Sequence, residues 1–388
     1  NMNLDQVRAA VAHVAGRATL PLAGLVAAAE DLDVLVVLIG TADKGSWLGD
    51  PGWFQGNMPA VGSPAGRLVL VGEEFRHDVY GHLVLFGMDK LAAADRRLNA
   101  RPIAFPPNAA AADAVRGEGG AVLQAHAPEA PTWQKEIPVL IALGKLDGLT
   151  ISDWNSLKPW YRWLNSGFRV TPVAETDAWV VYEKMPAGAS RTYVQVEGPL
   201  TAESLTAGIR EGRTVISHGP VVLMHVNGQP AGSTVELESD GSGGLKVEAR
   251  TFSAFPETAN AVLELVYNGA VVETLPFDGR GEPVTRIVRP AGDAGGWLAA
   301  RCRSAETGGA APRLLAHTAP VYVQAGGRPA ASADEARYWA DFTRQRLAEI
   351  LADGVFDSED QRQAIRDLYR RAIEVYEARM APPGAMQP

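Results

Sequence analysis

Carboxylate and imidazole side chains recur at the ends of apolar, strand-like runs in the first half of the chain. Glu74 and His126 each follow such a run, and Asp177 follows another. His82 opens a further run, eight residues after Glu74. Carboxylates and imidazoles together are the ligands that ions such as Mn²⁺, Fe²⁺ and Zn²⁺ take. Because such an ion makes a bound water nucleophilic near neutral pH, the pattern indicates metal-assisted hydrolysis.

Each of these residues also has a plainer structural interpretation. Glu74 would serve as a solvated loop acid, His82 as a hydrogen-bond donor to a loop carbonyl, and Asp177 as a helix N-cap. Strand alternation predicts that Glu73 points away from Glu74 and is a surface charge.

Three further polar residues lie near the candidate ligands in the sequence. His77 stands in a polar segment just after Glu74, and Lys145 and Arg191 fall in later segments. They are candidates to contact the substrate or the ligands. For Lys145, a salt bridge with Asp147 or another acid is the alternative.

The elements that must position these residues alternate in type over the first half. The run at 34–39 consists only of β-branched and aliphatic residues, which is typical of a parallel strand buried on both faces. Shorter apolar runs follow at 68–71, 83–86, 121–123 and 168–173. Helix-compatible stretches lie around 92–98 and 109–115. This alternation favours an α/β sheet or barrel.

Two helices are predicted ahead of the first strand. Leu4, Val7, Val11 and Val14 share one helical face, with Gly16 as the stop, and a second helix runs over 21–29.

The second half has a different periodicity. Apolar and polar residues alternate at 191–196, 245–252 and 262–267, and Asn268-Gly269 and Asn227-Gly228 read as hairpin turns. This pattern predicts an antiparallel sandwich up to about residue 323. Ser332 and Ser358 begin capping-box patterns that predict two helices in the tail.

Composition limits the class of protein. With 388 residues the chain is long enough for two or three domains, and a net charge of −9 without a basic run argues against nucleic-acid binding. We expect no membrane span, because every apolar run is too short. Cys302 is the only cysteine, which excludes an intrachain disulfide and a thiolate zinc site.

No signal peptide is visible, and the compartment (cytoplasmic, periplasmic or secreted) and the oligomeric state stay open.

Several segments resemble known metallohydrolases in an ordered series. Val-Gly-Glu-Glu at 71–74, Gly-His-Leu-Val-Leu-Phe-Gly at 81–87, Gln-Ala-His at 124–126 and Glu-Thr-Asp-Ala at 175–178 resemble successive motifs of the polymerase-and-histidinol-phosphatase (PHP) superfamily. The segments at 142–148, 160–169, 190–194, 213–220, 296–301 and 316–322 look like its carbaryl-hydrolase-like branch, the CehA/McbA family. The likeness covers about residues 20 to 340.

The resemblance implies a barrel that binds two or three divalent ions. Because the chain departs from the family pattern, we expect one to three ions of Mn, Fe or Zn. By position, Glu74 matches the bridging carboxylate, His82 and His126 match histidine ligands, and Asp177 matches the aspartate of the last barrel motif.

The chain departs from that pattern in three places. The opening His-x-His pair is absent where Asn1-Met2-Asn3 stands, an Asp-His pair is replaced by Ile-Gly-Thr at 39–41, and Trp179 replaces a histidine. Either the chain is trimmed just upstream of the first motif, or its metal site is reduced or dead.

The sequence thus predicts an α/β protein with three parts. A PHP-type distorted barrel covers 1–190, an immunoglobulin-like β-sandwich 191–327, and a helical segment 328–388. We expect a hydrolase of a small-molecule ester, carbamate, amide or phosphoester, with Glu74 and Asp177 catalytic and Asp177 as the base. The alternative is a catalytically dead scaffold whose sandwich binds a ligand or partner.

Overall fold

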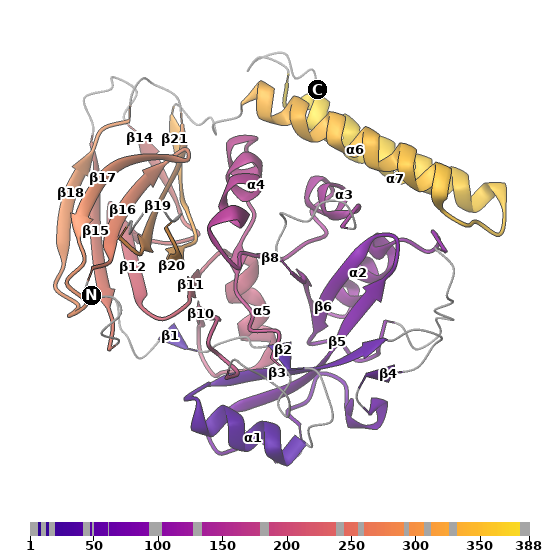
Figure 1. Cartoon of the computed structure of the whole chain (residues 1–388), viewed down its shortest axis with the longest axis horizontal. Coiled ribbons are helices and arrows are strands. Elements are labelled where there is room, and N and C mark those ends of the chain that lie inside the picture. Colours follow the sequence, from indigo (N-terminus) through magenta and orange to yellow (C-terminus); the bar gives the residue numbers. More distant parts are fainter. Residues whose placement is uncertain are drawn as a thin grey trace.

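The structure is a computed structural model that places two groups of strands side by side, with helices around them (Figure 1). It describes residues 7–8, 13–14, 20–41, 47–48, 50–60, 62–92, 103–126, 134–178, 186–237, 244–254, 260–290, 295–305, 312–325 and 332–380. Among these residues, no helix combines the length and the apolar character needed to cross a membrane.

The first sheet is mixed and contains the candidate ligands. Its path runs β2 (His13–Val14), β3 (Val34–Thr41), β5 (Leu68–His77), β6 (Gly81–Phe86), β7 (Ala121–Gln124), β8 (Gly148–Thr150) and β9 (Pro172–Val173), with β4 (Trp47–Leu48) paired to β3. The β5–β6 and β6–β7 pairs are antiparallel, and the other neighbours along the path are parallel. A short 3₁₀ turn, η3 (Pro51–Trp53), follows β4.

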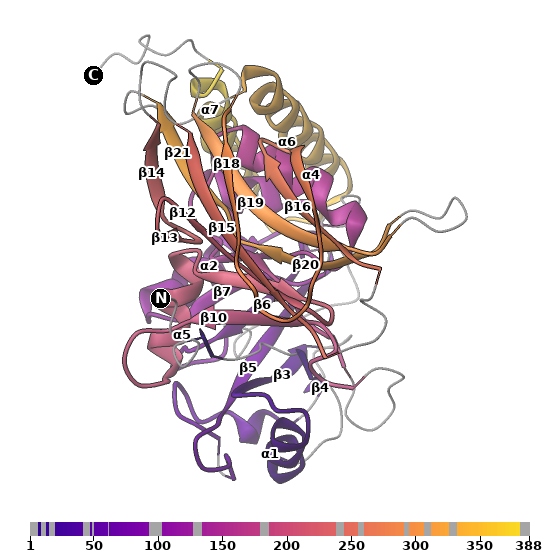
Figure 2. The ribbon, with the colours of Figure 1, turned by 90° about the vertical axis from the view of Figure 1, so that its left-hand side faces the viewer.

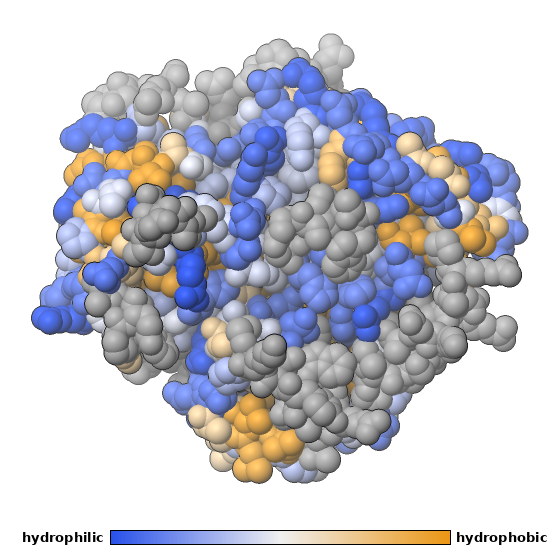
Figure 3. Space-filling model, in the orientation of Figure 1, coloured by the Kyte–Doolittle hydropathy of each residue, from blue (hydrophilic) through white to orange (hydrophobic). Residues whose placement is uncertain are grey.

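Apolar packing covers both faces of this sheet. Every residue from Val34 to Ile39 in β3 is at most 2% exposed, as the uninterrupted apolar run predicts. One face of β3 packs on α1 (Leu20–Ala29), and the other packs on β10 (Arg191–Gln195) and α5 (Ala202–Arg210). The outer side of α1 exposes Leu22 and Leu25. Figure 3 shows an orange patch at the bottom of the molecule, where α1 lies in Figure 1.

Three more helices belong to this part of the fold. They are α2 (Asn108–Gly117), α3 (Ile137–Ala142) and α4 (Trp154–Asn165). Asp153 caps α4 by accepting from the backbone N–H groups of Asn155 and Ser156. Helix α4 packs against the second half through a core that includes Tyr161 and Trp297.

The second half contains two sheets that share one core. The larger follows the order β1 (Val7–Arg8), β10, β11 (Thr214–Ser217), β20 (Leu314–Thr318), β19 (Gly296–Arg303), β16 (Val262–Tyr267) and β17 (Ala270–Pro276), with β21 (Val321–Ala325) joining β19 to β14 (Thr234–Leu237). The smaller follows β13 (Gln229–Pro230), β12 (Val221–Val226), β15 (Leu245–Phe252) and β18 (Val284–Val288). Figure 2 shows these strands face on.

Both predicted hairpin turns are confirmed. Asn268 and Gly269 join β16 to β17 with φ of 50° and 88°, and Asn227 and Gly228 join β12 to β13 with φ of 49° and 79°. Asn and Gly tolerate these left-handed conformations, which match the twist of the flanking strands.

The two predicted tail helices are also confirmed. Ser332 caps α6 (Ala333–Asp353) and Ser358 caps α7 (Glu359–Ala378), each through the backbone N–H three residues on. Tyr376 donates to the carbonyl of Pro138 over 2.7 Å and so fixes α7 against α3. In Figures 1 and 2, α6 and α7 lie at the opposite end of the molecule from α1.

Several element predictions were wrong. Val7–Arg8 and His13–Val14 are strands rather than parts of one helix, because their backbones pair with β10 and β3. Strand β5 continues through the glutamate pair to His77, so Glu74 lies inside a strand and not after one. Of the predicted strand at 168–173 only β9 forms.

One helix was missed in the segment that was predicted to be all sandwich. Helix α5 begins with a Thr201–Ser204 capping box and buries Leu205 and Ile209 against the first sheet. The helix predicted around 92–98 lies almost wholly outside the described residues.

Candidate metal centre

Glu74 and His82 meet because β5 and β6 form a tight antiparallel pair. In this register His82 lies opposite Arg76, two residues from Glu74 on the same face of β5. The Glu74 Oε1 atom lies 2.9 Å from His82 Nδ1, and Arg76 Nε lies 3.8 Å from the same oxygen.

His126 joins them through an unusual backbone conformation. Continued strand alternation after β7 would place its ring on the face of Gln124, whose β6 partner Leu83 packs on the other side of the sheet. Instead His126 has a φ of 65°, which breaks the alternation. Its Nε2 atom comes within 3.6 Å of Glu74 Oε1 and 3.2 Å of His82 Nδ1. Such strain gathers at functional sites when the surrounding structure enforces it.

The three donor atoms have the separation that one ion requires. One ligand atom each from Glu74, His82 and His126 lies within 4.8 Å of the others. Donors 2.0–2.1 Å from a tetrahedral ion stand about 3.4 Å apart. The three donor atoms are separated by 2.9, 3.2 and 3.6 Å, distances that bracket that value. Two ring nitrogens this close repel through their lone pairs unless a proton or a cation lies between them.

The cluster opens toward solvent on one side. The exposed fraction of the side chain rises from 7% for Glu74 to 16% for His82 and 29% for His126. The side of the cluster that faces solvent is therefore the His126 side.

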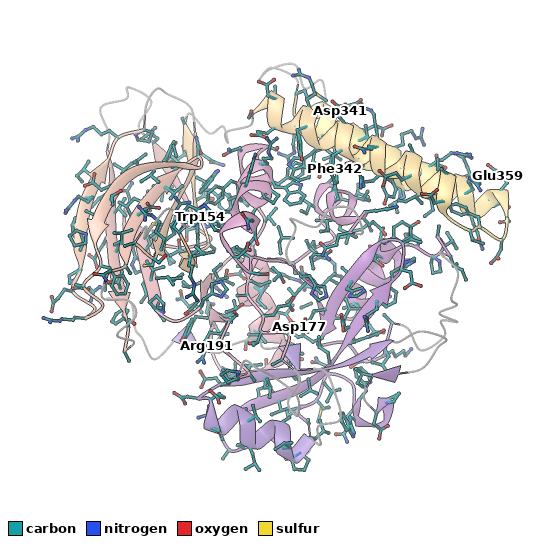
Figure 4. The ribbon with its side chains drawn as sticks, in the orientation of Figure 1. Trp154, Asp177, Arg191, Asp341, Phe342 and Glu359 are labelled. Atoms are coloured by element: carbon teal, nitrogen blue, oxygen red, sulfur yellow. The ribbon has the colours of Figure 1, made fainter. Side chains whose placement is uncertain are left out.

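Asp177 lies beyond His126 and outside this group of three. Its Oδ2 atom stands 3.9 Å from His126 Nδ1, the ring nitrogen that faces away from Glu74, and its side chain is 46% exposed. It also has a positive φ, of 52°. The geometry brings Asp177 to the site as the carboxylate behind a histidine, a common way to orient metal-binding imidazoles. Figure 4 labels Asp177 near the centre of the molecule.

Glu175 was missed as a site residue, although it begins the Glu-Thr-Asp-Ala segment. Its Oε1 atom accepts the backbone N–H of His126 over 3.0 Å and lies 3.1 Å from Thr150 Oγ1. It thereby holds the strained His126 backbone in place. A carboxylate two residues before Asp177 was the available signal.

Burial and charge act in opposite directions on His126. Burial lowers its pKa, while the hydrogen bond with Glu74 and the charges of Glu175, Asp177 and Glu74 raise it, and the net pKa lies above the ordinary value. The site therefore favours positive charge on this ring, as a site for a cation would.

The structure does not bring the three outer candidates to the cluster. His77 lies on the opposite face of β5, where its ring nitrogens contact the Pro106 carbonyl and the Val79 N–H. Lys145 forms an ion pair with Asp113, which agrees with the alternative prediction of a salt bridge to Asp147 or another acid. Arg191 donates from Nε to the carbonyl of Gly188.

Two of the three departures from the PHP pattern, at Trp179 and at Asn1-Met2-Asn3, lie outside the described residues, whereas residues 39–41 are the last of β3. Comparison with known proteins gave no match to a family model, to a curated protein or to a solved structure. The chemistry of the cluster is therefore inferred from its residues and their geometry.

Proposed function

We propose that the chain is a metal-dependent hydrolase whose divalent ion (Mn, Fe or Zn) is held by Glu74, His82 and His126. The observation that carries the proposal is the convergence of one carboxylate and two imidazoles from three neighbouring segments of one sheet. The mixed oxygen and nitrogen donor set fits a borderline ion. The proposed substrate is a small-molecule ester, carbamate, amide or phosphoester.

The fold assignment belongs to the same proposal. We take the first sheet as a PHP-type distorted barrel and the second half as an immunoglobulin-like sandwich, in the manner of the CehA/McbA family. The ordered motif resemblance and the shared core of the two sheets support this assignment.

Each side chain then has a defined task. When bound, the ion supplies Lewis acidity and a water of lowered pKa. Glu74 contributes the negative charge that the ion requires. His82 and His126 contribute neutral nitrogen ligands, and the more exposed His126 marks the side of the site that faces solvent. Asp177, whose Oδ2 atom faces His126 Nδ1 on the far side of the ring from the ion, orients this imidazole, and its position does not favour the role of base that the sequence predicted. Glu175 fixes the His126 backbone and so keeps the ring in position.

The test is elemental analysis of protein purified without a histidine tag, after incubation with each ion. We expect about one or more equivalents in the parent. Glu74→Ala and His126→Ala should lose the metal, while His225→Ala, a histidine on β12 away from the cluster, should keep it. Hydrolysis of chromogenic ester, carbamate and phosphoester substrates should likewise be lost in Glu74→Ala and His126→Ala and kept in His225→Ala.

A parent chain that takes up no ion would contradict the proposal and favour the dead scaffold. Equal metal content in all four proteins would place the ion elsewhere.

A further inference from the structure

A second cleft lies where α4 meets the second half of the molecule. It has a volume of about 420 Å³, within the range of small-ligand sites, and such sites favour domain junctions. Helix α4, the β16–β17 turn, β19 and the first turn of α6 contribute to its wall. Figure 4 labels Trp154, the first residue of α4, at this junction.

The cleft is positively charged although the whole chain has a net charge of −9. Three cations line it, Lys158, Arg162 and Arg301, against one acid, Glu335. Arg162 pairs with Glu335 over 2.9 Å. Within the described part of the chain, Lys158 has no ion-pair partner, so its charge is directed at solvent or a ligand.

Hydrogen-bond acceptors in the wall are already used. Asn165 Oδ1 accepts from the indole N–H of Trp297, and Asn268 Oδ1 accepts from the Trp297 backbone N–H. The carboxylate of Glu335 is engaged by Arg162.

Donors, in contrast, are left over. Arg301 uses Nε with Glu264 (2.7 Å) and Nη1 with the Tyr161 hydroxyl (3.2 Å), which leaves Nη2 without a partner among the described residues. The same holds for the indole N–H of Trp154 and the Lys158 ammonium group. A wall that offers donors and few acceptors is complementary to a ligand with acceptor oxygens.

The central cation is fixed before any ligand arrives. The Arg301 guanidinium lies 4.4 Å from the ring centroid of Trp154, and the buried Glu264 also binds Arg303. Tyr161 donates to His317 Nε2 over 2.6 Å, since His317 Nδ1 donates to the Thr318 carbonyl. Preorganisation of this kind lowers the entropy cost of binding.

We propose that this cleft binds a small organic oxyanion, a carboxylate or a phosphate ester, through Arg301, Lys158 and Trp154. The body of the ligand lies against the Trp154 ring, and the site is separate from the metal centre and independent of the proposed hydrolysis.

Calorimetry on the full chain tests the proposal, before and after treatment with EDTA. The probes are benzoate and phenyl phosphate, with neutral benzyl alcohol as the matched control. We expect benzoate and phenyl phosphate both to bind, before and after EDTA treatment, and benzyl alcohol not to bind. The tighter of the two anions identifies the charged group that the cleft prefers.

Two substitutions locate the binding site. Lys158→Ala should weaken anion binding roughly tenfold, because it removes a charge-assisted hydrogen bond. Lys246→Ala, at an exposed lysine on β15, should leave it unchanged. Trp154→Phe replaces the indole with a smaller aromatic ring and removes the N–H, and we expect anion affinity to fall about threefold.

Three results would overturn the proposal. The first is that neither benzoate nor phenyl phosphate binds. The second is that both anions bind Lys158→Ala and Trp154→Phe as tightly as they bind the parent. The third is that binding disappears with EDTA or in His126→Ala. The last result would assign the anion to the metal centre.

Discussion

Two histidines of this protein, His126 and His317, lie in opposite environments. His126 is partly exposed just past the end of β7, faces three carboxylates, and has a raised pKa. His317, on β20, is fully buried against α4, where its neighbours are the Tyr161 hydroxyl and the Arg301 guanidinium. Burial, with a smaller contribution from the nearby charge of Arg301, lowers the pKa of His317 to about 3 against the opposing hydrogen bond with Thr318.

The contrast separates a histidine that serves the fold from one that serves a site. Both nitrogens of His317 are satisfied by uncharged groups, so the ring stays neutral and joins two parts of the molecule. The nitrogens of His126 both face carboxylates, whose negative charge favours a proton or a metal ion on the ring. Residue type alone does not distinguish them, whereas burial and the charge of the partner do.

The largest expected effect is on stability at the junction. His317→Ala should lower the free energy of unfolding by about 3–4 kcal/mol, because it creates a cavity and leaves the Tyr161 hydroxyl without its buried acceptor. Urea denaturation followed by circular dichroism measures the change. The same variant should keep its metal content. A loss of less than about 1 kcal/mol would refute the structural role assigned to His317.

The pH dependence of stability provides a second, smaller test of the same contrast. Between about pH 6.5 and pH 3 the unfolded chain binds a proton at His317 that the folded chain does not. The free energy of unfolding therefore falls as the pH falls through this window, by up to about 1.4 kcal/mol per pH unit for this group.

His317→Ala lacks that proton site, so the stability gap between parent and variant should narrow by about 2 kcal/mol from pH 6.5 to pH 5. His218 acts in the same direction, because burial lowers its pKa to about 4, but it is present in both proteins. A gap that stays constant over this range would show that His317 titrates normally in the folded state.

The sequence was sufficient where one physical signal dominated. The apolar run of β3, the Asn-Gly turns and the serine caps of α6 and α7 each depend on local chemistry, and all were predicted. Helix α5 was missed because it lies between alternating strands and packs on a sheet formed mostly by residues far from it in the sequence. The strands at Val7–Arg8 and His13–Val14 form by pairing with distant partners, against a helical local pattern.

The candidate site was predictable in its residues but not in its geometry. Glu74, His82 and His126 were selected by type and position, and they do converge. The positive φ of His126 and the supporting contact of Glu175 were not predictable, because both depend on how β7, β8 and the segment after β9 meet. Asp177 was selected as a ligand and lies one side chain further out.

The smallest predicted effect concerns the hydrogen bond by which Glu175 holds the His126 backbone. Glu175→Ala keeps all three donor atoms but removes the acceptor for the His126 N–H, so the strained backbone should relax and the ring should lose its fixed position. We expect metal affinity to fall about tenfold, the lower end of the range for residues that orient ligands. Competition with a chromogenic chelator measures the affinity. Glu273→Ala, at an acid on β17 that pairs with Arg286, should leave it unchanged. If Glu175→Ala binds metal as tightly as the parent, then the three donors alone hold His126 in place and the positive φ needs no external support.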